Sequence, residues 1–320
     1  MVDIAPAFAR FVVNRLMDHP PHQGGFRNWL QHGTYTVELQ TTPLVIRLLG
    51  ISPAEALRFV LFDYSRFAFS SAESIAKSYE PIFDAKAIAW RLLNQYYASF
   101  FAGHALLRSR GLGVTRIERT EANYLQKVIR ATSNPAFNMD AGTYKFTLTI
   151  ANDYNATIEI SKLAQGSGGA HAEFWVFFST QLEQFSTDLV AENRPDAAQI
   201  VGRVDELRRL LGGPEKTNFS WLSSMRNEIN YQHKFGTWFP FYKATETRLP
   251  EINVLRQSNS ALSLAVSTKN APIEAFCRAN NFLSLLNIDV AQLLSRRGGK
   301  GAAQFSTEWK HLLQKLKIKR

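Results

Sequence analysis

Residues 85–110 read AKAIAWRLLNQYYASFFAGHALLRSR, a stretch rich in alanine, leucine and aromatic residues that contains no proline. Gly111 follows it directly, and glycine is the usual residue just beyond the last turn of a helix. Composition and terminator together predict one long helix with enough apolar side chains to pack against several neighbours. This stretch therefore favours a mainly α-helical fold.

Helical patterns continue on both sides of this stretch. On its N-terminal side, Ser52-Pro53 suits a helix start, with serine as the cap and proline as the first helical residue, and predicts a helix to Phe67. Ser70 with Glu73 fits the capping box of a further short helix. The other predicted helices cover residues 6–17, 120–131, 172–192, 196–211, 219–234, 271–297 and 308–318.

Two segments follow the two-residue period of β-strands instead. Residues 34–39 alternate in this way, and the runs 144–150 and 156–160 flank a polar tetrapeptide, which predicts a hairpin. The Gly/Ser-rich residues 165–169 are predicted to form a loop. The fold prediction is thus mainly α: an antiparallel helical bundle over 81–300 with a β-hairpin inserted near 142–160, a small mixed N-terminal region over 1–80 and a basic C-terminal helix over 301–320.

The overall composition is that of a folded protein with an excess of positive charge. Of 320 residues, 45% are hydrophobic and 20% charged, and the formal net charge of +10 favours polyanionic partners such as RNA. The single cysteine, Cys277, excludes an intramolecular disulfide and a Cys-based zinc site. Residues 1–17 lack the pattern of a signal peptide, and no long apolar run predicts membrane insertion. We therefore expect a cytoplasmic protein.

The segment from Ser224 to His233 carries the strongest candidate for chemistry. On a helix, a seven-residue step returns to within about 20° of its start, so Arg226 and His233 are predicted to share one face, about 10 Å apart. An arginine beside the apolar stripe of a helix is costly unless it is paired or in use. This pair is therefore the predicted site.

Such a pair suits RNA cleavage without a metal. A histidine can take a proton from a ribose 2′-hydroxyl or return one to the leaving oxygen, and a guanidinium grips phosphate through two parallel hydrogen bonds. Asn227 and Asn230 could orient either group. Further phosphate contacts are predicted from Lys234 and from the basic residues Arg296, Arg297 and Lys300 before the last helix. No metal and no cofactor is expected, because the histidines show no ligand spacing.

Other interpretations of the same residues stay open. Arg27 and His32 form a rival pair, although a five-residue step rotates them by about 140° on a helix. Arg226 could instead lie on a solvated helix edge and bridge to Glu228 or another carboxylate. His104 and His171 are expected to serve in packing and at a helix start, respectively.

Two stretches resemble the HEPN superfamily of α-helical bundles, many of which are metal-independent ribonucleases. One is Arg226-Asn227 followed after five residues by His233, and the other is the aromatic and small-residue helix from Tyr96 to Arg108. The resemblance implies that Arg226 and His233 are catalytic, that Asn227 supports them and that the chain forms a homodimer. It also implies a role in anti-phage defence or toxin–antitoxin growth arrest, with an antitoxin or sensor subunit as a further partner.

The expected function is accordingly that of an endoribonuclease that forms a 2′,3′-cyclic phosphate. The alternative is a non-catalytic helical subunit that binds nucleic acid or another protein of a defence complex. Chelator-resistant cleavage of RNA distinguishes the two.

Overall fold

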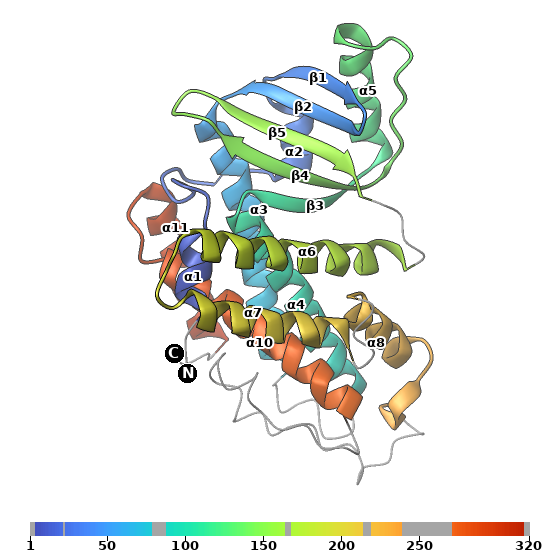
Figure 1. The fold of residues 1–320 in the computed structure, drawn as a ribbon, viewed down its shortest axis with the longest axis vertical. Helices are drawn as coiled ribbons and strands as arrows, with labels where there is room; N and C mark the ends of the chain where they lie inside the picture. Colours follow the sequence, from blue (N-terminus) through green and yellow to red (C-terminus); the bar gives the residue numbers. More distant parts are fainter. Residues whose placement is uncertain are drawn as a thin grey trace.

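A computed structural model describes residues 4–21, 23–78, 88–163, 168–213, 219–238 and 271–316. Figure 1 shows a β-sheet at one end of the molecule and a body of helices below it. Two long helices, α3 (Pro53–Ser78) and α4 (Ile88–Ser109), run from the sheet into this body. Most of the predicted loop at 165–169 lies outside the described residues.

The sheet has five antiparallel strands in the order β1-β2-β5-β4-β3, so the predicted helical bundle with an inserted hairpin is wrong. The fold combines α-helices with a β-sheet, and the helices form the larger part of it. The predicted hairpin does form, but it is the centre of the sheet and not an insertion. The strands are β1 (Thr36–Thr41), β2 (Leu44–Ile51), β3 (Leu112–Ile117), β4 (Gly142–Ile150) and β5 (Ala156–Lys162).

The missed strands explain this error. In β2, Ile46, Leu48 and Ile51 are buried, and Ile46 pairs with Ile160 of β5. This pairing joins residues that lie far apart in the sequence, and no local pattern announces it. Strand β3 begins after Gly111, whose positive φ of 73° lets the chain reverse at the end of α4. It therefore follows the long helix without a recognisable linker.

Helices α3 and α4 form the centre of the structure. The predicted start at Pro53 is confirmed, but α3 continues without a break to Ser78, so the capping box predicted at Ser70 is wrong. Ser71 and Ala72 are fully buried at that point, and packing there keeps the helix continuous. In α4 the predicted helix is confirmed from Ile88 onward, whereas residues 85–87 lie outside the described part.

The remaining helices surround this pair. Helices α2 and α5 pack beside the sheet, and α6 and α7 lie side by side across the helical body, next to α8 and α10 (Figure 1). Their bounds are α1 (Ala5–Arg10), α2 (Phe26–His32), α5 (Arg119–Thr132), α6 (Gly169–Ala191), α7 (Ala197–Gly212), α8 (Trp221–Asn230), the 3-10 turn η1 (Lys234–Gly236), α10 (Ala271–Leu294) and α11 (Lys300–Lys315).

Helix α11 begins eight residues before its predicted start, and its apolar side is packed. Phe305 and Trp309 are buried, and the Phe305 ring lies 5.5 Å from that of Tyr64 in α3. One continuous apolar core contains residues from all three predicted regions, and the boundaries at 80 and 300 stay predictions. Cys277 is buried in it, and burial raises the pKa of its thiol to about 12. Among the described helices, none is long and apolar enough to cross a membrane.

A buried ion pair joins the sheet to the helices. Arg108, near the end of α4, lies 3.6 Å from Asp63 of α3 and donates a hydrogen bond of 3.0 Å to the Val114 carbonyl of β3. Its guanidinium carbon also lies 4.7 Å from the centre of the Phe146 ring in β4. Asp63 in turn accepts a hydrogen bond from the Phe26 amide at the start of α2. These contacts fix the sheet on α3 and α4.

Candidate functional site

Arg226 lies on α8, where this helix packs against α4, and two polar side chains orient it. Its Nη2 donates to the Tyr97 hydroxyl oxygen at 2.9 Å, and its Nη1 donates to Oδ1 of Asn227 at 2.8 Å. The side chain is partly exposed, and it forms no ion pair with any carboxylate of the described residues. Arg226 forms no ion pair with Glu228, which pairs with Lys234 at 3.4 Å, and the alternative of a solvated helix edge stays open.

Aromatic rings surround this guanidinium. Its central carbon lies 6.0 Å from the centre of the Tyr96 ring, 5.8 Å from that of Tyr97 and 5.5 Å from that of Tyr231. Cation–π attraction to the rings stabilises the cation without neutralising its charge. Arg226 is therefore held in place with its positive charge available to an anion.

A histidine that the sequence analysis assigned only to a helix start lies beside Arg226. His171, in the first turn of α6, has its Nδ1 2.8 Å from the Tyr96 hydroxyl, and Trp175 Nε1 donates to the same hydroxyl at 3.2 Å. Burial raises the pKa of Tyr96, so the phenol keeps its proton. The phenol donates to Nδ1 in the tautomer of His171 that carries its proton on Nε2, and it accepts from Nδ1 in the other tautomer.

The charge state of His171 follows from its surroundings. Burial, and then repulsion by Arg226, lower its pKa to about 4, so the imidazole is neutral at pH 7. Its ring stacks on Phe100 with the ring centres 4.3 Å apart. In the tautomer with its proton on Nε2, His171 presents an N–H group near Arg226, an arrangement suited to oxygen atoms of an anion.

His233 is not on the helix that carries Arg226. The prediction that α8 extends to Lys234 is wrong, because the helix ends at Asn230 and His233 has a left-handed backbone with φ of 52°. Beyond Ile229, Asn230 is only partly buried and Tyr231, Gln232 and His233 are exposed, so no buried apolar side chain continues the helix. The predicted shared helix face therefore does not exist. The His233 ring instead lies 5.6 Å from the Trp238 ring.

The turn after α8 has a strained backbone and is held to the helix by a hydrogen bond. Phe235 also has a positive φ, of 68°, which is unusual for a bulky side chain. Trp238 Nε1 donates to the Ile229 carbonyl at 2.6 Å and so ties the turn back to the helix. His233 is consequently exposed at a defined place near the end of α8, and its catalytic role stays a prediction.

The predicted phosphate-binding residues lie in two separate places. Asn227 supports Arg226 directly, Asn230 is the last residue of α8 and Lys234 is in η1. Arg296, Arg297 and Lys300 follow the far end of α10, whose other end approaches α8 through the Trp221–Phe276 ring contact. At 1.5 Å per residue they lie roughly 30 Å from that contact. The structure does not bring these three to Arg226, and Arg297 donates to the Ala9 carbonyl instead.

The rival pair, Arg27 and His32, is engaged elsewhere. Both residues lie on the short helix α2, where Arg27 Nη2 pairs with Glu121 of α5 at 2.7 Å. His32 Nδ1 lies 2.9 Å from the Asn28 carbonyl. The carboxylate of Glu121 neutralises Arg27, so this pair offers an anion much less than Arg226 does.

Sequence reasoning missed Tyr96, Tyr97 and His171 as site residues. Tyr96 and Tyr97 were noted only as part of a packing helix, and His171 only as a helix-start residue. Neighbouring tyrosines are a weak signal, since buried tyrosine hydroxyls need polar partners. Their polar partners come from two helices, α6 and α8, that are distant in the sequence, and no spacing rule predicts such contacts.

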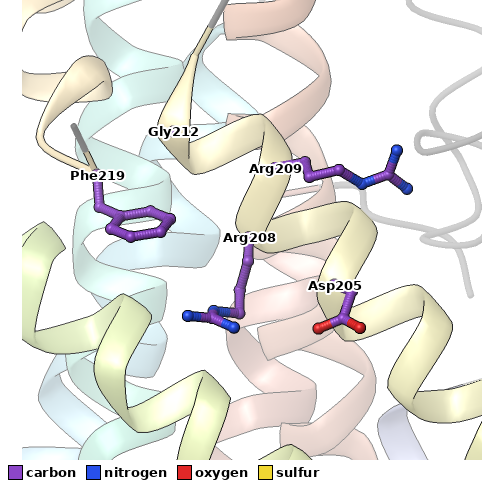
Figure 2. Close-up of a pocket in the computed structure, with 5 residues that line it drawn as sticks. All are labelled: Asp205, Arg208, Arg209, Gly212 and Phe219. Atoms are coloured by element: carbon purple, nitrogen blue, oxygen red, sulfur yellow. The ribbon is translucent and has the colours of Figure 1, made fainter. Parts of the chain in front are cut away.

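A separate hollow of about 360 Å³ lies at the end of α7. Figure 2 shows its lining residues, with Arg208 and Arg209 directed to different sides of the helix. Arg208 pairs with Glu183 at 2.9 Å, and its guanidinium carbon lies 5.6 Å from the Phe219 ring centre. The charges do not converge on the hollow, so we assign no site there. Its lining residues are Asp205, Arg208, Arg209, Gly212 and Phe219.

Comparison with known proteins found no matching family model, no matching curated protein and no matching solved structure. The candidate site therefore depends on its own geometry. Among the described residues, no three His, Cys, Asp or Glu side chains lie close enough together to hold a metal ion. The likeness of residues 226–233 to the HEPN motif stays a prediction.

Proposed function

We propose that the protein cleaves RNA as a metal-independent endoribonuclease, with Arg226 as the phosphate clamp. The observation that carries this proposal is the state of Arg226: it is oriented by Tyr97 and Asn227, partly exposed, and without a carboxylate partner among the described residues. A guanidinium in this state binds phosphate with its remaining N–H groups.

The chemistry assigns distinct tasks to the two histidines. His233, exposed near the end of α8, takes the proton of a ribose 2′-hydroxyl. The 2′-oxygen bonds to the neighbouring phosphorus and the bond from phosphorus to the 5′-oxygen breaks. The leaving oxygen takes a proton from water, and His233 returns its proton to the solvent. The products are a 2′,3′-cyclic phosphate and a 5′-hydroxyl. His171 donates from Nε2 to a phosphate oxygen and, with Arg226, stabilises the developing charge.

The family resemblance adds an assembly and a setting to this proposal. It implies a homodimer that acts in the cytoplasm in anti-phage defence or growth arrest, under control of an antitoxin or sensor subunit. Light scattering on the purified protein measures the oligomeric state, and a monomer that cleaves RNA would remove the dimer from the proposal.

The test is an incubation of purified protein with total RNA in EDTA. Cleavage that yields cyclic phosphate ends is expected for the wild type and lost in Arg226→Ala and His233→Ala. Arg209→Ala and His311→Ala are matched controls, because both residues are exposed and lie on other helices. Equal cleavage by Arg226→Ala and the wild type would refute the assignment.

The end of α8 at Asn230 favours a second candidate, a subunit that binds RNA without cutting it. His233 is not on the same helix face as Arg226. Arg226 can therefore bind a phosphate without a proton-transfer group beside it on α8. For this candidate, the wild type retains RNA in a salt-sensitive manner and Arg226→Ala retains less, while no variant produces cleavage.

A further inference from the structure

Large aromatic side chains are exposed next to the Arg226 site. Trp90 in the first turn of α4 is 53% exposed, and Tyr231 at the end of α8 is 68% exposed. The Trp238 ring lies 5.5 Å from the Trp90 ring and nearly perpendicular to it, at 76°. We call Trp90, Trp238 and Tyr231 the aromatic rim.

The rim and the guanidinium belong to one surface region. Trp90 and Tyr97 are seven residues apart on α4, so they share a helix face, and Tyr97 accepts a hydrogen bond from Arg226. Tyr231 reaches the same guanidinium from the end of α8. Figure 1 shows α8 beside the first half of α4.

Exposure alone does not mark a binding site, and Tyr154 illustrates the difference. Tyr154, in the turn between β4 and β5, is 90% exposed, but it contacts no ring or cation of the described residues. The aromatic rim instead combines two exposed rings, Trp90 and Tyr231, and the partly exposed Trp238 with a cation that pairs with no carboxylate of the described residues. An apolar protein segment would cover the rings but leave the charge of Arg226 desolvated and unpaired, which is costly.

We propose that the aromatic rim binds an unpaired nucleobase whose adjoining phosphate is held by Arg226. This inference deepens the proposed function and rests on it for the phosphate clamp. A nucleotide in a flexible strand offers both parts at once, a π-face for stacking and an anion for the guanidinium. A base inside a duplex has its faces covered, so the rim selects nucleotides outside base pairs.

The test measures binding of short 2′-O-methyl oligonucleotides, which the proposed reaction cannot cut because their 2′-hydroxyl is blocked. One carries ordinary bases, and a second has the same length and charge but is abasic. We expect Trp90→Ala to weaken binding of the first about 5- to 100-fold and to leave binding of the second unchanged. Trp90→Phe keeps a ring and is expected to restore most of the binding. Tyr154→Ala is the matched control and should behave as the wild type.

The outcomes separate this inference from the proposed function. A base-dependent loss in Trp90→Ala without any cleavage of ordinary RNA supports the rim and removes the nuclease. Cleavage of ordinary RNA together with equal binding of both oligonucleotides by the wild type and Trp90→Ala supports the nuclease and overturns the rim. Failure of the wild type to bind either oligonucleotide also overturns it. Circular dichroism of each variant verifies the fold, and Trp90→Phe provides the test if Trp90→Ala does not fold.

Discussion

Helix α4 is associated with two arginines in opposite states, Arg108 near its C-terminus and Arg226 against its middle. Near its C-terminus, Arg108 is buried and paired with Asp63, and the Val114 carbonyl and the Phe146 ring complete its surroundings. Nearer its N-terminus, Tyr97 accepts a hydrogen bond from Arg226, which is partly exposed and has no carboxylate partner in the described residues. An arginine side chain thus connects the sheet to the helices at position 108, whereas at position 226 it presents its charge at the surface.

The difference follows from desolvation. A guanidinium sealed from water requires a counter-charge inside the protein, and burial still lowers the pKa of Arg108 to about 10. Arg226 retains part of its hydration and is surrounded by tyrosine rings and neutral oxygens, so its charge can be neutralised from outside. Whether an arginine serves the fold or a ligand is therefore decided by its partners.

The largest expected effect is a loss of stability when the partner of Arg108 is removed. Asp63→Ala leaves Arg108 buried without its counter-charge and also removes the acceptor for the Phe26 amide. We expect a loss of about 3–5 kcal/mol in the free energy of unfolding, measured by urea denaturation. Arg226→Ala should cost less than about 1 kcal/mol in the same assay, as expected for a partly exposed side chain. Equal losses in the two variants would erase the distinction between the two arginines.

The next largest effect is a loss of RNA cleavage when Arg226 is replaced. Arg226→Ala removes the clamp on the transition-state charge and should lower the cleavage rate about 100- to 1,000-fold, measured with saturating labelled RNA in EDTA. Arg226→Lys keeps the charge but loses the two-pronged geometry, and an intermediate rate is expected. A lysine variant as fast as the wild type would show that charge alone suffices.

A single substitution can give Arg226 a carboxylate partner, as Arg108 already has. Asn227→Asp places a carboxylate where the Arg226 guanidinium now donates to an amide oxygen. The resulting pair should lower RNA affinity about 10-fold, measured by fluorescence anisotropy, and leave stability within about 1 kcal/mol of the wild type. Asn227→Ala is the control, with the hydrogen bond lost but no negative charge added. Affinity unchanged in Asn227→Asp would mean that RNA phosphate does not depend on Arg226.

The smallest effect concerns the pH dependence of stability. His171 takes up its proton near pH 6.5 when unfolded, but burial and Arg226 lower its folded pKa to about 4. The unfolded chain therefore binds more protons between these values, and the stability from His171 is present above pH 6.5 and lost as the pH falls toward 4. His171→Gln should flatten this part of the stability curve, measured by urea denaturation at pH 4.5–7. His104, whose pKa burial also lowers, leaves a residual slope. An unchanged slope in His171→Gln would contradict the folded pKa.

Local pattern predicted helices well and the sheet poorly. The segment 88–109 is one helix because its apolar residues recur on a face that α3 and α10 cover, and this periodicity is visible in the sequence. Strand β2 carries an apolar run that is equally compatible with a buried helix, and its identity is decided by pairing with β1 and β5. The fold class was wrong because two of five strands depend on such distant partners.

The candidate site divides in the same way. Arg226 and Asn227 could be selected from the sequence, because an arginine beside an apolar helical stripe needs a reason to be there. The expected partner, His233, depended on a helix that ends too early, since no apolar side chain anchors it after Ile229. His171 could not be selected from the sequence, because its link to the site is the Tyr96 hydroxyl and the two residues are 75 positions apart.

The sequence by itself determined the helical segments around 88–109, the central hairpin and the positive charge of the chain, because periodicity, turn residues and composition act over short distances. Tertiary structure alone decided that the strands form one sheet, that Arg108 pairs with Asp63 inside the protein and that Arg226 has no carboxylate partner among the described residues. These outcomes depend on which groups are brought together and how much water they lose, and both are properties of the packed chain.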